Sequence, residues 1–109
     1  MITNDNSRSA IALAALQQVM DPEINLNVAD LGLIYQIDFD DLHSRIYVTM
    51  TLTTQYCPMG ESIAEAVKRV IKNTFPDMLI ELRITFDPHW SSDMISAKGK
   101  AFLGTTGLK

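Results

Sequence analysis

The stretch VTMTLTTQYCPMGESIAEAVKRVI, residues 48–71, passes from a strand pattern to a helical pattern within a few positions. Up to Thr53, apolar residues occupy every second position, which indicates a strand with one covered face. From Ile63 onward, apolar residues recur every three or four positions, which indicates a helix with one buried stripe. Proline is favoured at the first helical position. The sequence therefore predicts a strand over 45–53 and a helix over 58–75, with Pro58 at its start and Cys57 at its cap.

The segments on either side extend this pattern. A first helix is predicted from Ser7 or Ser9 to about residue 20, and a short last helix from Asp93 to about residue 103. Alternating apolar residues predict strands over 33–39 and 79–87. Residues 1–6 are polar and expected to be loose. The order α-β-β-α-β-(α) predicts a compact α/β (α+β) domain whose small mixed sheet has helices on one face.

The bulk composition limits the classes of function. The chain has 109 residues and a formal net charge of −4, which argues against binding to nucleic acid or to an anionic membrane. We expect one domain over 1–109, with a core over about 10–104 and flexible termini. The start has no apolar run of the kind that a signal peptide needs, and no stretch approaches the ~20 apolar residues of a membrane span. A cytoplasmic location is therefore expected.

Cys57 is the only cysteine of the chain. A cap position would direct free backbone N–H groups and the positive end of the helix dipole at its sulfur, which favours the thiolate. Thr53 and Thr54 add hydroxyl groups nearby. The alternative is a packed and inert thiol, which is common for free cysteines. A single cysteine excludes an intramolecular disulfide and a Cys-rich metal cage built from one chain.

Two further polar segments are candidates for the same site. Asp21 and Glu23 flank Pro22, and they either form a simple turn or line a cavity near Cys57. His89 follows the third predicted strand, where it is either a metal ligand or base or an exposed turn residue. Trp90 beside it is expected to be a core anchor or a partner contact.

Several segments together resemble the small domain shared by metal–sulfur cluster biosynthetic proteins. This group includes SufT-like proteins, the PaaD subunit of phenylacetate catabolism and the eukaryotic cytosolic iron–sulfur targeting factors. The resemblance covers about residues 10–104, and its specificity lies in the order and spacing of its pieces. They are DPEINLNVADLGLIY (21–35), VTMTLTTQYCPMGESI (48–63), ITFDPHWSSDMIS (84–96) and AFLG (101–104). PaaD-type members usually carry extra cysteines in a C-terminal extension, so the general bacterial form is the better match.

The resemblance implies an iron–sulfur cluster assembly domain-like fold. It also implies an accessory role, without enzymatic turnover, in assembling clusters or delivering them to client proteins. The partners implied are the iron–sulfur assembly machinery and client apoproteins. The residues carried over are Cys57, Asp21, Glu23, Thr53 and Thr54, gathered around one pocket.

The number of thiols limits how a cluster can be held. A cluster usually needs four protein ligands, and this chain offers one thiolate. We therefore expect iron or a cluster to be bound transiently and shared with a client, an exogenous thiol or a second subunit, which makes a homodimer one expectation.

Two other classes of function stay open at this point. One is an enzyme in which Cys57 is the nucleophile and His89 or Glu23 the base. The other is a protein-interaction domain in which Cys57 only packs.

Overall fold

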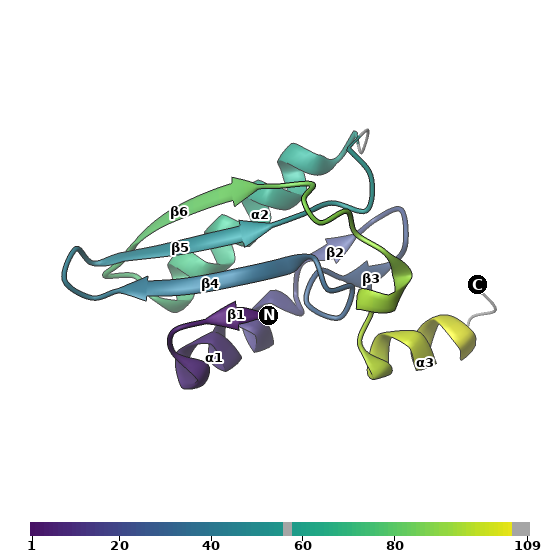
Figure 1. Cartoon of the computed structure of the whole chain (residues 1–109), viewed down its shortest axis with the longest axis horizontal. Helices are drawn as coiled ribbons and strands as arrows, with labels where there is room; N and C mark the ends of the chain where they lie inside the picture. Colours follow the sequence, from purple (N-terminus) through teal and green to yellow (C-terminus); the bar gives the residue numbers. More distant parts are fainter. Residues whose placement is uncertain (56–57, 106–109) are drawn as a thin grey trace.

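The computed structural model describes residues 1–55 and 58–105, and Figure 1 shows the whole chain. Seven elements build the main layers: β1 (Ile2–Thr3), α1 (Asn6–Leu16), β4 (Ile34–Asp40), β5 (Arg45–Met50), α2 (Gly60–Thr74), β6 (Leu79–Ile84) and α3 (Ala97–Thr105). Three short elements complete the described chain: β2 (Met20–Asp21), β3 (Leu26–Asn27) and the 3₁₀ turn η1 (Ser92–Met94). No described helix is both long and apolar enough to cross a membrane.

The main sheet has four strands in the order β1-β4-β5-β6. β4 and β5 form an antiparallel hairpin, whereas β1 pairs with β4 and β6 pairs with β5 in parallel. Figure 1 shows α1 and α2 on the same face of this sheet, and α3 beyond its end. The predicted α/β fold, with a small mixed sheet and helices on one face, is confirmed.

The core lies between the sheet and the two helices. Ile46, Val48 and Met50 alternate along β5 and are almost completely buried. The α2 residues Ile63, Val67 and Ile71 are buried too, at the three- and four-residue spacing that the sequence shows. Burying one such side chain contributes roughly 1.5–3 kcal/mol. The strict periodicity of these two segments therefore explains why the sequence of 48–71 predicts a strand followed by a helix.

The N-terminal residues, expected to be loose, form an edge of the sheet instead. Ile2 pairs with Gln36, and the side-chain amide of Asn4 both donates to and accepts from the backbone of Phe39, at 2.9 Å each. The Asn4 side chain thus forms the two hydrogen bonds that the backbone of a further β1 residue would otherwise form with Phe39. Backbone pairing therefore orders a segment whose side chains are too polar to predict it.

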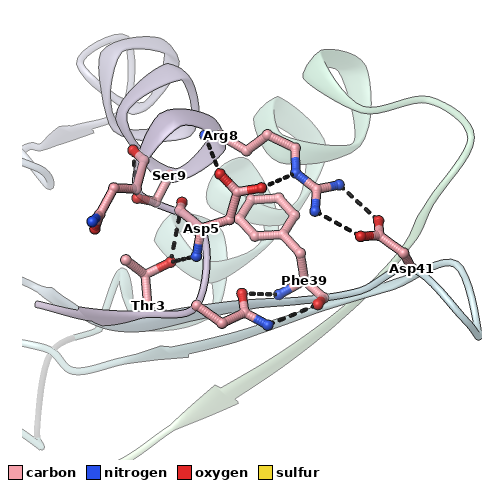
Figure 2. Close-up of polar contacts among 8 residues, drawn as sticks. Thr3, Asp5, Arg8, Ser9, Phe39 and Asp41 are labelled. Atoms are coloured by element: carbon pink, nitrogen blue, oxygen red, sulfur yellow. Dashed lines mark hydrogen bonds and ion pairs between the residues drawn. The ribbon is translucent and has the colours of Figure 1, made fainter.

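Helix α1 begins one turn earlier than predicted and is shorter. Its N-cap is Asp5, whose Oδ1 accepts from the Arg8 backbone N–H at 3.0 Å, rather than Ser7 or Ser9. Figure 2 shows the Arg8 guanidinium between the carboxylates of Asp5 and Asp41, and it lies 4.4 Å from the centre of the Phe39 ring. The helix ends at Leu16 and not near residue 20, because Met20 and Asp21 are drawn into the β2–β3 ribbon.

Two of the three predicted strands are shorter than predicted at their C-terminal ends. β5 ends at Met50 rather than at 53, and β6 ends at Ile84 rather than at 87. The alternation along 45–53 would place Thr51 on the outer face, but it is completely buried, and its N–H donates to the Leu33 carbonyl at 2.8 Å. A register shift between Ile34 and Gln36 breaks the alternation of β4, so that Leu33 and Ile34 are both buried.

The C-terminal helix is capped by Ser96 and not by Asp93, which lies in η1. The Ser96 hydroxyl accepts from the Gly99 N–H at 3.0 Å and donates to the buried carboxylate of Asp30 at 2.9 Å. A Cβ on Gly99 would lie 2.8 Å from Ile95 and 3.0 Å from Leu26. The glycine that weakens the helical pattern here therefore allows α3 to pack closely against the β3 region.

Candidate functional site

Asp21 organises the turn between β2 and β3. Its side chain is only 1% exposed, and its Oδ1 accepts from the Glu23 N–H at 2.9 Å. The Asn25 N–H closes the same turn onto the Asp21 carbonyl at 2.7 Å, and Asn25 itself has a positive φ of 62°. This Asx-type turn agrees with the first alternative given for Asp21 and Glu23, that DPE forms a simple turn. It also holds Pro22 and Glu23 at the surface, where both are exposed.

A surface groove brings the Asp21 turn next to the start of α2. The groove has a volume of about 370 Å³. Pro22 and Met20 line it from the turn, and Met59 and Ser62 line it from the α2 side. Two of the motif segments singled out in the sequence, DPE and CPMGES, therefore meet across one groove. Its lining residues Met20, Met59 and Ser62 carry no sequence signal that separates them from ordinary surface or packing residues.

Cys57 lies outside the described residues. The structure corrects what precedes α2: the helix begins at Gly60 with Met59 as its N-cap, and Pro58 and Met59 form a turn before it. Pro58 is therefore not the first helical residue, and Cys57 comes two residues before the cap. At this start Gly60 packs closely against Leu52, since a Cβ at Gly60 would lie 2.7 Å from the Leu52 Cδ1.

The predicted pocket residues from the LTT segment follow the end of β5. Thr53 is half-buried and Thr54 is exposed, and both belong to the irregular segment that leads toward Cys57. At the other end of that segment, α2 has no side-chain cap at Met59 and carries Glu61 in its first turn. The polar side chains that line the groove are Gln18, Ser62, Arg69 and Asn73. The predicted pocket residues Asp21, Glu23, Thr53 and Thr54 are not among its lining residues.

The DPHW segment lies on a different part of the molecule. Trp90 is half-buried, and its indole N–H donates to the Leu31 carbonyl at 2.7 Å. The Tyr35 hydroxyl donates to the Pro88 carbonyl at 2.9 Å, so this segment is tied to the ADLGLIY segment at two points. His89 is exposed. Within residues 1–55 and 58–105, no three His, Cys, Asp or Glu side chains are grouped closely enough to hold a metal ion.

Comparison with known proteins agrees with the resemblance seen in the sequence. The sequence model of a family described as iron-sulfur cluster assembly protein matches residues 10–79. A Bacillus subtilis protein named Fe-S protein maturation auxiliary factor YitW is 35% identical over 92 residues, covering 84% of this chain and 89% of that protein. Fe-S protein maturation auxiliary factor SufT of Staphylococcus aureus is 38% identical over 88 residues, covering 81% and 99%.

Solved structures have the same fold. A crystal structure from Bacillus anthracis, titled as a domain of unknown function DUF59, superposes with a TM-score of 0.80 at 32% identity, covering 91% of this chain and 98% of that one. A solution structure from Mycobacterium tuberculosis, described as associated with Fe-S complex assembly and repair, gives a TM-score of 0.51 at 27% identity, covering 97% and 92%. From the matched family model and these relatives, the chain belongs to the family of iron-sulfur cluster assembly proteins.

Proposed function

We propose that this protein is an accessory factor in the maturation of iron–sulfur proteins, and that it acts through Cys57. The accessory role rests on the family and on relatives that are named Fe-S protein maturation auxiliary factors. The role of Cys57 rests on its place in the sequence, between the LTT segment and the turn that starts α2.

The groove shared by Pro22, Met59 and Ser62 is the observation that carries the proposal. DPE and CPMGES are separated widely in the chain, yet Pro22 of the first and Met59 and Ser62 of the second line one surface groove. In the proposal, Asp21, Glu23, Thr53 and Thr54 surround the thiol of Cys57 beside this groove. Asp21 fixes the turn, and the exposed Glu23 and Thr54 face an approaching partner.

Iron or a cluster is cargo in this scheme, and a client protein or a small thiol supplies the remaining ligands. A thiolate is a ligand for iron, but a cluster usually needs four protein ligands. The bound state is therefore shared and short-lived, which suits delivery to a client rather than storage. No classical turnover reaction is required of the chain.

The test is anaerobic transfer to an apo client in the presence of iron, sulfide and a small thiol. Wild type is expected to accelerate recovery of the client's charge-transfer absorption and activity, and Cys57→Ser is expected to lose most of that acceleration. Ser92→Ala, an exposed hydroxyl change in η1, is the matched surface control and is expected to behave as wild type.

Equal rates for wild type and Cys57→Ser would exclude a role for the thiol. Full rescue of a deletion strain by Cys57→Ser would exclude it too. Glu23→Gln distinguishes the contribution of the pocket from that of the thiol. In the proposal this variant slows cluster transfer to the client, while alkylation of Cys57 by iodoacetamide still goes to completion.

A further inference from the structure

The hydrogen bonds between β5 and β6 show which backbone groups of β6 point away from the sheet. Leu79 donates to the Ser44 carbonyl and Thr85 donates to the Met50 carbonyl, at 2.8 Å each. In a parallel ladder, the residues that bond to a neighbour alternate with residues whose N–H and C=O point the other way. Residues 79, 81, 83 and 85 therefore bond to β5, and Ile80, Leu82 and Ile84 direct their backbone groups outward.

This outer edge is open in the described chain. β6 is the last strand of the sheet, and no described residue hydrogen-bonds to the outward N–H or C=O of Ile80, Leu82 or Ile84. In Figure 1, α2 lies behind β6, and no further strand is drawn alongside β6 on this side. The opposite edge differs, because β1 and the Asn4 amide cover β4 there. An uncovered edge without proline is a template for another strand.

The side chains of β6 make this edge complementary to itself. Glu81 and Arg83 are exposed on the open face, while Ile80 and Leu82 face the helices. Consider two copies of β6 paired antiparallel, with Leu82 of one opposite Leu82 of the other. In this register, Glu81 of each copy lies directly opposite Arg83 of the other copy, so two oppositely charged pairs form. The neighbouring registers that keep the same hydrogen-bonding residues put Glu81 opposite Glu81 or Arg83 opposite Arg83. Charge therefore selects a single register, since like charges directly opposite are destabilising.

We propose that β6 is the docking edge for β6 of a second copy of this chain, in the antiparallel register centred on Leu82. About six backbone hydrogen bonds form between Ile80, Leu82 and Ile84 of the two copies. The result is one continuous sheet made of two four-stranded halves. Helices of both copies lie on the same side of it, because the two-fold axis is perpendicular to the sheet.

The apolar contacts and the ion pairs both support this register. Ile84 is 37% exposed in the single chain and comes to lie opposite Ile80 of the second copy. Glu81, which already contacts Arg45 at 2.9 Å, gains Arg83 of the second copy as a second partner. A single strand edge buries less than a standard interface of about 1,200–2,000 Å², so a dissociation constant of about 10 µM to 1 mM is expected.

A different occupant is the main rival. The groove of about 500 Å³ between β6 and α2 is lined by Lys68, Arg69 and Lys72 as well as by Glu65. These cations would also suit an acidic extended segment of another protein. The second copy is favoured because cation placement on α2 gives no strand register, whereas Glu81 and Arg83 give one.

The test is sedimentation equilibrium of the full chain between about 10 µM and 1 mM, where a reversible dimer is expected. Arg83→Glu should weaken it at least about tenfold, and Glu81→Arg combined with Arg83→Glu should return it to within about threefold of wild type. Ile84→Pro removes an outward N–H without touching the bonds to β5, and a loss of about tenfold is expected. Lys98→Glu, an exposed charge reversal on α3, is the control.

Amide hydrogen exchange reads the register directly and does not depend on any variant. Protection of Ile80, Leu82 and Ile84 should rise with protein concentration, while Glu81, Arg83 and Thr85 should be protected at every concentration. A monomer over the whole range overturns the proposal and leaves the edge to an acidic segment of another protein. A dimer that keeps its affinity in both Arg83→Glu and Ile84→Pro also overturns it, because its interface then lies elsewhere.

Discussion

At the scale of single residues, Gly32 shows how one backbone position fixes the neighbourhood of a motif. Its φ of 77° lies in the left-handed region, and a Cβ there would lie 2.2 Å from the Met94 carbonyl oxygen. The backbone of the ADLG turn therefore touches the backbone of η1 directly. A side chain at this position would push apart two segments whose hydrogen bonds depend on that contact.

Gly32→Ala is expected to destabilise the protein by at least about 2 kcal/mol, because both its φ and the space around it oppose a side chain. Gly60→Ala is the matched control. It lies at the start of α2, its φ is not positive, and its Cβ would meet the side chain of Leu52 rather than backbone. A change within about 1 kcal/mol is expected there, since the helix gains propensity. Urea unfolding of both variants measures the difference, and equal losses would contradict the argument.

At the scale of elements, what the sequence reveals depends on how many residues share one pattern. β5 and α2 are predicted to within a few residues, because each repeats its apolar spacing over several positions. β1, β2 and β3 have two residues each, too few to carry a period, and none of them is predicted. The polar bonds that hold them, such as that of Asn4 to Phe39, leave no apolar signature.

The candidate site, too, is predicted from the sequence only in part. The motif order suggests that DPE and CPMGES belong together, and Pro22 and Met59 do line one groove. The sequence could not show that Asp21 is buried, because an aspartate before a proline usually reads as a surface turn. Nor could it place the start of α2, because Pro58 is a favourable first helical residue, whereas in the structure Pro58 and Met59 form a turn before Gly60.

Ser96→Ala is predicted to loosen α3 without affecting the rest of the fold. The substitution removes the cap at the Gly99 N–H and one of the bonds to Asp30, with an expected cost of about 1 kcal/mol. Amide exchange at Gly99 should accelerate, while amides of α2 stay protected. Ser92→Ala serves as the control, and equal exchange at Gly99 in both variants would argue against Ser96 as the cap.

At the scale of the whole molecule, carboxylates on one side of the sheet link stability to pH. The bidentate and capping contacts of Arg8 hold the pKa of Asp5 and of Asp41 below the ordinary 3.8. The side-chain hydrogen bond of His43 lowers the pKa of Asp40 as well. Because these groups are more acidic in the folded state, their contribution is fully present above about pH 4 and is lost as the pH falls through the lowered values.

The midpoint of urea unfolding is therefore expected to fall as the pH drops below about 4, while these three carboxylates contribute little change between about pH 5 and pH 7. In Arg8→Met, the part of this acid dependence that comes from the Arg8 guanidinium should disappear, whereas the backbone N–H of residue 8 still lowers the pKa of Asp5. An acid dependence that is unchanged in Arg8→Met would show that other carboxylates are responsible.

The dimer register also determines how far apart the two α2 helices begin. In an antiparallel pairing of β6, the N-terminal ends of the two α2 helices, each preceded in sequence by Cys57, lie at opposite ends of the joint. Six strand residues span about 20 Å. In the proposed dimer, the starts of the two α2 helices therefore lie far apart.

The mixture of pairings in the sheet also sets an order of events when the chain folds. The β4–β5 hairpin joins neighbours in sequence, so it closes with little loss of chain entropy and is expected to form first. β6 must wait for α2 to cross the sheet, and β1 joins only when Ile2 reaches Gln36. An element that arrives late and makes few bonds is also the first to detach, so spontaneous opening of the native protein should begin at β1.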